Sequence, residues 1–147
     1  MESKPTRFFL DANVLFSAAH RPEGRCAGLL ELAGRKRCAL LTSPYAVEET
    51  RRNIREKSPA ALGRLDHLLQ SVRMTEEAPS DLVREAVVRH GVPASDGPIL
   101  AAALKSGAGY LVTGDRNHFG RLMDRRISDL AVQVLSPASA LRLLLVG

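Results

Sequence analysis

Apolar residues follow two alternating patterns along this chain. Short, almost wholly apolar runs are separated by longer segments in which apolar residues recur every three to four positions. The short runs predict buried strands, and the longer periodicity predicts amphipathic helices. Strands are expected at residues 7–11, 38–42, 71–75, 110–113 and 131–136, the third of them at a sheet edge. Helices are expected at residues 26–34, 44–54, 59–70, 80–90, 95–107 and 140–146, with a helical turn at 117–124.

Strands that alternate with helices predict an α/β fold with a mainly parallel sheet covered by helices on both faces. Strand 7–11 should lead into a loop or a helix, and Ser43 and Ser95 are expected to cap the helices that follow them. In such a sheet, ligands usually bind in the crevice outside the carboxyl ends of the strands. Residues that directly follow strands are therefore the first candidates for a site.

Length and composition agree with one compact domain. The chain has 147 residues, of which 45% are hydrophobic, so residues 1–147 are expected to form a single domain with a real core. No apolar stretch approaches the roughly 20 residues of a membrane span, and the start MESKPTR lacks the apolar run of a signal peptide. We therefore expect a cytoplasmic protein. Cys26 and Cys38 form no CxxC pair and are expected to be small buried hydrophobes.

Four separated acidic residues stand at the edges of apolar segments. They are Asp11, Glu49, Asp96 and Asp115. Carboxylates that converge in a fold repel one another unless a cation lies between them. Such hard oxygen ligands suit Mg²⁺ or Mn²⁺, which can activate water for attack on phosphorus. The set therefore predicts metal-assisted phosphodiester hydrolysis, although each acid alone has an ordinary alternative as a turn or helix-end residue.

The charge balance favours a polyanionic partner. Lys and Arg exceed Asp and Glu by 21 to 16, and several arginines lie next to the acids in sequence. The candidates for contact with such a partner, which is RNA if the resemblance described below holds, are Arg51, Arg52, Arg116, Arg121, Arg125 and Arg126. A solvated basic face is the alternative for each of them. Because Phe8, Phe9 and Phe16 are expected in the core, only Tyr45 and Phe119 remain near these segments to stack on bases.

In their order along the chain, the segments LDANVL, SPYAVEETRRNI, DGPILAAAL and LVTGDRNHF resemble the successive motifs of PIN-domain nucleases. The resemblance runs from Arg7 to Ser136 and is closest to VapC-like toxins of toxin-antitoxin systems. It implies a three-layer α/β/α sandwich and RNA cleavage that depends on Mg²⁺ or Mn²⁺. It also implies an antitoxin protein as partner and a homodimer as one assembly.

Matched motif by motif, the resemblance assigns Asp11, Glu49, Asp96 and Asp115 as both catalytic and metal-binding residues. Glu48 is the alternative to Glu49, which fits the family's spacing to Ile54 better. The residues that resemble the family's polar companions, which orient ligands or water, are Asn13 and Thr113.

The chain departs from the family pattern at His118, where many relatives carry a further acid. An imidazole can ligate a metal, transfer a proton or cap a loop. Since one negative charge is lost, we expect one well-occupied cation and at most a weak second one.

Two other functions remain open at this point. A non-catalytic PIN-like RNA-binding or scaffold module is the first, and His118 favours it. The second is a Mg²⁺-dependent phosphatase of small substrates, which would need a second aspartate where this chain has Asn13.

Overall fold

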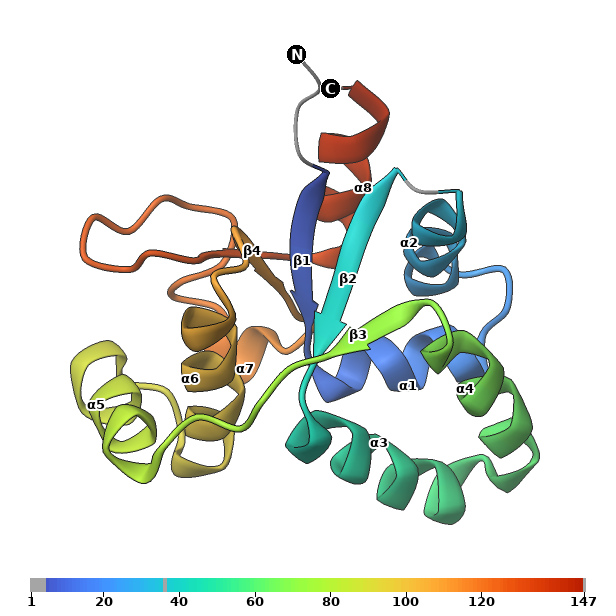
Figure 1. Cartoon of the computed structure of the whole chain (residues 1–147), viewed down its shortest axis with the longest axis horizontal. Helices are drawn as coiled ribbons and strands as arrows, with labels where there is room; N and C mark the ends of the chain where they lie inside the picture. Colours follow the sequence, from blue (N-terminus) through green and yellow to red (C-terminus); the bar gives the residue numbers. More distant parts are fainter. Residues whose placement is uncertain (1–4, 36, 147) are drawn as a thin grey trace.

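The computed structural model describes residues 5–35 and 37–146 and has a parallel sheet at its centre (Figure 1). The strands are β1 (Thr6–Leu10), β2 (Cys38–Thr42), β3 (Val72–Met74), β4 (Tyr110–Val112) and β5 (Gln133–Leu135). They lie in the order β3-β2-β1-β4-β5, and every neighbouring pair is parallel. All five predicted strands are therefore present, and the third lies at an edge of the sheet as expected.

Helices connect the strands and cover both faces of the sheet (Figure 1). They are α1 (Ala12–His20), α2 (Arg25–Gly34), α3 (Pro44–Lys57), α4 (Leu62–Leu69), α5 (Ser80–His90), α6 (Gly97–Ser106), α7 (Arg116–Phe119) and α8 (Pro137–Val146). Short 3-10 turns, Pro59–Ala61 and Ala94–Asp96, precede α4 and α6. Among the described residues, no helix has the length and apolar content to cross a membrane.

The alternation of strand side chains divides the core into two halves. Phe8 and Leu10 pack with α1, α2 and α8, whereas Phe9 and Leu41 pack with α5 and α6. All four of these side chains are at most slightly exposed. Because both faces are buried at the centre of the sheet, β1 and β2 contain continuous apolar runs rather than alternating ones, whereas the edge strand β3 is partly exposed. The predicted three-layer α/β/α sandwich is confirmed.

The caps and ends of helices give one confirmation and one correction. Ser43 caps α3 as predicted, because its hydroxyl accepts a hydrogen bond from the backbone N–H of Ala46 at 3.2 Å. The prediction for Ser95 is wrong. Residues 94–96 form the 3-10 turn, so that Asp96, which makes no side-chain capping bond, occupies the cap position of α6.

Other differences are local. The chain enters α1 directly after Asp11, so β1 leads into a helix rather than into a loop. The predicted turn at 117–124 is helical only over α7, and α8 begins at Pro137 rather than near residue 140.

The order of the strands places a topological switch point between β1 and β4. From β1 the chain moves to β2 on one side, whereas β4 pairs with the other side of β1. The hydrogen bonding between β1 and β4 extends one residue past the end of β1, since the N–H of Asp11 donates to the carbonyl of Val112 at 3.1 Å. Ligands in open α/β sheets bind at such a point.

Candidate active site

Asp11 is fixed at the carboxyl end of β1 and is only 2% exposed. Its Oδ1 accepts a hydrogen bond from the N–H of Ala12 at 2.7 Å, at the start of α1. Its Oδ2 accepts bonds from Thr113 Oγ1 at 2.8 Å and Asn13 Nδ2 at 3.1 Å. These donors leave one lone pair of Oδ1 without a bond among the described residues, because each carboxylate oxygen accepts about two.

Asn13 and Thr113 tie the ends of β1 and β4 together. The Thr113 hydroxyl accepts from Asn13 Nδ2 and from the N–H of Asp115, both at 3.1 Å. Asn13 Oδ1 in turn accepts from the N–H of Gly114 at 2.8 Å. The two polar companions expected from the sequence thus lie between the first and the last acid, where they fix the loop that carries Asp115.

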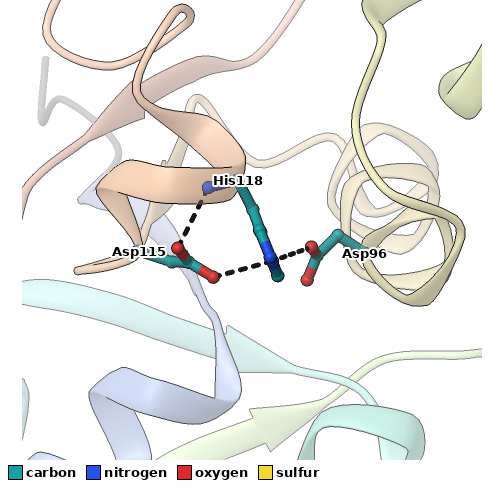
Figure 2. A group of neighbouring side chains, drawn as sticks. All are labelled: Asp96, Asp115 and His118. Atoms are coloured by element: carbon teal, nitrogen blue, oxygen red, sulfur yellow. Dashed lines mark hydrogen bonds and ion pairs between the residues drawn. The ribbon is translucent and has the colours of Figure 1, made fainter.

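Asp96, Asp115 and His118 form a compact group, and the His118 ring lies between the two carboxylates (Figure 2). Nδ1 of His118 is 2.7 Å from Asp96 Oδ2 and 2.9 Å from Asp115 Oδ2. The backbone N–H of His118 also donates to Asp115 Oδ1 at 3.0 Å, so Asp115 caps α7. One possible ligand atom from each of the three residues lies within 4.8 Å of the others.

Glu49 joins this group from α3. The four acids and His118 all line one open cavity of about 270 Å³. The exposed Glu48 is absent from its described lining, so the structure brings Glu49 rather than Glu48 to the other acids. Asp11 and Glu49 stand in the cavity wall outside the compact group of three.

The surroundings of the Oδ2 atom of Asp96 indicate whether the cavity suits a cation. This atom is shielded from solvent, and no aligned hydrogen-bond donor reaches it within the described parts of the chain. His118 Nδ1 lies close to it, but the contact lacks hydrogen-bond alignment and is an ion pair only when the ring is protonated. A buried carboxylate oxygen without a donor is unfavourable. Oxygen ligands around such an atom fit Mg²⁺ or Mn²⁺, and the imidazole also fits Mn²⁺.

The electrostatics of the cavity favour protonation of three of its acids, Asp11, Glu49 and Asp96. Burial raises the pKa of Asp11 to about 6, against the opposing hydrogen bonds from Thr113 and Ala12, and the charges of Asp96 and Glu49 raise it further. Burial is also the main cause of the raised pKa values of Glu49 and Asp96. For Glu49 the charge of Asp96 adds to the effect, whereas for Asp96 the nearby His118 opposes it. A divalent cation would reverse these shifts by stabilising the ionised forms.

The arginines expected to contact RNA do not form one patch. Arg51 pairs with Asp66 at 2.7 Å, and Arg121 donates to the carbonyl of Gly91 at 3.1 Å. Arg52 is exposed, and its charge acts on Glu49. Arg116 lines a second cavity, next to the acidic one, and Arg125 and Arg126 are exposed beyond α7.

The aromatic side chains require two corrections. Phe119 is 0% exposed and packs in the core, so it is wrong as a candidate for base stacking. Phe16 was expected in the core, yet it is only half-buried and lines the acidic cavity. Tyr45 is half-buried, and its hydroxyl donates to the carbonyl of Ser95 at 2.8 Å.

Sequence reasoning missed Asn53 and Lys57 as polar residues of the cavity, and it expected Ser95, which also lines the cavity, only as a helix cap. Asn53 and Lys57 lie on α3, four and eight residues after Glu49. Residues four apart share one face of a helix, so this spacing could have indicated them once Glu49 was chosen.

Fold and site together define a class: parallel α/β proteins with an acidic, cation-compatible cavity at the switch point of the sheet. A family model described as "PIN domain" matches residues 7–117. The chain belongs to the PIN-domain family, which confirms the family resemblance.

Solved structures share this fold at low sequence identity. The protein PAE2754 from Pyrobaculum aerophilum is 20% identical, with a TM-score of 0.70 over 97% of this chain and 91% of that one. VapBC2 from Rickettsia felis, bound to a promoter DNA fragment, is 19% identical, with a TM-score of 0.66 over 88% and 98%. VapC20 from Mycobacterium tuberculosis, a toxin that cleaves the sarcin-ricin loop, is 18% identical, with a TM-score of 0.53 over 78% and 94%. A comparison with curated proteins gives no match.

Proposed function

We propose that this protein is a metal-dependent endoribonuclease that hydrolyses phosphodiester bonds of RNA with the acidic cavity. The observation that carries the proposal is the convergence of four carboxylates and His118 on one cavity, where the buried Oδ2 atom of Asp96 lies 2.7 Å from His118 Nδ1. Carboxylates that are brought together in this way repel one another unless a cation lies between them. Membership of the PIN-domain family supports the same activity.

The residues of the cavity have distinct roles in this proposal. Asp11, Glu49, Asp96 and Asp115 would hold Mg²⁺ or Mn²⁺, with His118 as a further ligand or a proton carrier. When bound, the ion supplies a nucleophile at neutral pH and offsets charge on the phosphate. Thr113 and Asn13 keep the Asp11 carboxylate in one orientation through their hydrogen bonds. Lys57 and Asn53 add donors that can hold phosphate oxygens at the wall of the cavity.

His118 bears on the number of ions. Its ring takes up space between Asp96 and Asp115, and it brings no negative charge where an acid would bring one. A second divalent ion would therefore gain less attraction. We propose one well-occupied ion and at most a weak second.

The biological setting is proposed from the solved structures that share this fold. Two of the similar solved structures are VapBC complexes bound to DNA, and another is FitAcB from Neisseria gonorrhoeae. We place this chain with them as the toxin of a toxin-antitoxin pair, a single-domain cytoplasmic protein restrained by an antitoxin protein. The exposed apolar side chains of Leu143, Leu145 and Val146 at the end of α8 are a surface on which a homodimer or the antitoxin can pack.

A matched pair of variants tests the nuclease proposal. Glu49→Gln removes a charge from the cavity, whereas Glu48→Gln removes the same charge one residue away, outside the described lining. Purified proteins are incubated with a mixed structured RNA in Mn²⁺, Mg²⁺ or chelator, and the cut ends are mapped. We expect cleavage by wild type and Glu48→Gln only with metal, and at least a hundredfold loss in Glu49→Gln, on the order of a lost electrostatic contact in a catalytic site. Equal activity of both variants would refute the site, and RNA binding without cleavage in any metal would favour the scaffold function.

A further inference from the structure

A second cavity lies on the other side of the loop that carries Asp115. It has a volume of about 320 Å³, and its walls come from the end of α1, the start of α2, the α7 region and the start of α8. The residues that matter for the inference are Ser17, Arg21, Gly24, Arg25, Arg116 and Ser136. None of them is among the acids of the first cavity.

This basic cavity concentrates positive charge from three separate segments. Arg21, Arg25 and Arg116 all line it, and none of the three makes a side-chain hydrogen bond or an ion pair within the described residues. The described lining contains no Asp or Glu. Besides Asp115 of the acidic cavity, two acids adjoin lining residues in sequence. They are the exposed Glu23 and Asp124, whose pKa is lowered by hydrogen bonds from Ser136 and Ser139 and by the charge of Arg116. None of these acids forms an ion pair with the three arginines among the described residues, and three like charges around one cavity favour an anion.

The start of α2 adds backbone donors to the same cavity. Its cap residue is Gly24, which has no side chain to accept from the first-turn N–H groups, and no side-chain capping bond is present. The N-terminal end of a ten-residue helix carries partial positive charge. Ser136, at the start of α8, is 5% exposed, and its Oγ accepts from the N–H of Ser139 at 3.2 Å. Uncapped amides and arginines together suit the oxygens of a phosphate.

The basic cavity and the acidic cavity share one loop. Gly114 lines the basic cavity, while its N–H donates to Asn13, a residue of the acidic cavity. Asp115 lines the acidic cavity, and the next residue, Arg116, lines the basic one. A strand of RNA that crosses this loop would present successive phosphates to both cavities, since its backbone carries a phosphate at every nucleotide.

We infer that the basic cavity binds a backbone phosphate of the RNA substrate, next to the phosphate that is cleaved. The inference rests on the proposed nuclease function. Arg21, Arg25 and Arg116 are positioning residues that hold the strand in register with the acids, because guanidinium groups can contact phosphate oxygens in pairs. An acidic protein segment is the competing occupant. The shared loop favours RNA, because a polymer with regularly spaced phosphates can fill both sites at once.

Binding and cleavage are measured separately to test the inference. A fluorescent single-stranded RNA is titrated with each protein at several salt concentrations, in chelator, so that metal-dependent cleavage does not occur during the binding measurement. Wild type is compared with Arg21→Gln, Arg25→Gln and the double variant, and with Arg84→Gln as the matched control. Arg84 is an exposed arginine on α5, on the far side of the sheet from α2 (Figure 1). Thermal melting checks that each variant is folded.

The expected result follows from counterion release. Each lost phosphate contact lowers the salt slope of binding by about 0.7, which is about a fivefold weaker affinity at 0.1 M salt. We expect this change for each cavity variant, about twenty-fivefold for the double variant, and none for Arg84→Gln. In Mn²⁺, the cavity variants should also shift or blur the cut sites of the wild type.

Three outcomes would overturn the inference, and they differ from failure of the nuclease proposal. Cavity variants that bind RNA with the affinity and salt slope of Arg84→Gln would overturn it even if wild type cleaves. Failure of wild type to bind RNA in any salt would overturn it as well. If the cavity variants bind a polyglutamate peptide more weakly than wild type does but bind RNA equally well, the cavity would be assigned to a protein partner. In contrast, the expected loss of RNA affinity without metal-dependent cleavage would uphold the basic site and refute only the nuclease.

Discussion

Replacing Asp11 by Asn should stabilise the metal-free protein at neutral pH. The pKa of the Asp11 carboxyl is raised from 3.8 to about 6, chiefly by burial. At roughly 1.4 kcal/mol per pKa unit, this shift corresponds to about 3 kcal/mol of destabilisation when the group is ionised. The amide oxygen can replace only one of the two carboxylate oxygens. If it accepts from the N–H of Ala12, the NH₂ group faces Asn13 and Thr113 and cannot accept from them, which costs about 1–2 kcal/mol. The net gain expected for Asp11→Asn is about 1–2 kcal/mol.

The pH dependence gives this prediction its sign. Below pH 3.8 the carboxyl is protonated in the folded and in the unfolded protein, so the raised pKa has no effect there. Between pH 3.8 and about 6 the unfolded chain releases the proton while the folded protein keeps it, and stability falls as pH rises. Above pH 6 the full cost remains. The raised pKa values of Glu49 and Asp96 act in the same direction in wild type.

The assay is chemical and thermal unfolding of both proteins in chelator at pH 4.5 and pH 7.5. The melting temperature of Asp11→Asn should exceed that of wild type by about 3–6 °C at the higher pH and by much less at the lower pH. Mn²⁺ should raise the melting temperature of wild type and close this gap, because it binds the folded state. A variant that is less stable than wild type at both pH values would refute the electrostatic reasoning.

Two further predictions concern residues whose place in the structure decides their role. His118→Asp should raise the affinity for Mn²⁺ about tenfold, as measured by calorimetry. Nδ1 of His118 lies within 3 Å of both Asp96 and Asp115, so an added carboxylate there would attract the cation more strongly. Unchanged affinity would place His118 outside the metal site. Phe119→Ala should destabilise the protein by about 3–5 kcal/mol in urea, since the ring is 0% exposed; a loss of RNA affinity with normal stability would restore the stacking role that burial excludes.

The sequence was sufficient for the strands and for the order of the acids. β1 and β2 contain the continuous apolar runs 8–10 and 38–41 because both faces of the sheet are covered there, and this pattern is visible without any tertiary information. Asp11 and Thr113 directly follow two strands, so the rule for parallel sheets already brought them together. The hydrogen bond between them, at 2.8 Å, shows how close the two strand ends lie.

The sequence was insufficient where a role depends on which way a side chain points. Phe119 and Phe16 look alike in sequence, yet one is in the core and the other lines the acidic cavity. Ser95 has the residue type of a cap, but the 3-10 turn moves the start of α6 past it. Arg21 and Arg25 were not singled out, because only the packing of α1, α2 and α8 brings them to Arg116.

The metal-dependent nuclease activity proposed for the acidic cavity is tested most directly by measuring bound Mn²⁺ and RNA cleavage in the same samples. Wild type and Asp96→Asn are titrated with Mn²⁺, the free ion is followed by electron paramagnetic resonance, and the cut ends are quantified at each step. We expect that cleavage rises with the first bound ion and that chelator abolishes it. Asp96→Asn should lose both the tight ion and the cleavage, since the buried Oδ2 atom is removed as a ligand. Cleavage that persists in chelator, or a tightly bound ion that is retained by Asp96→Asn with full activity, would contradict this proposal.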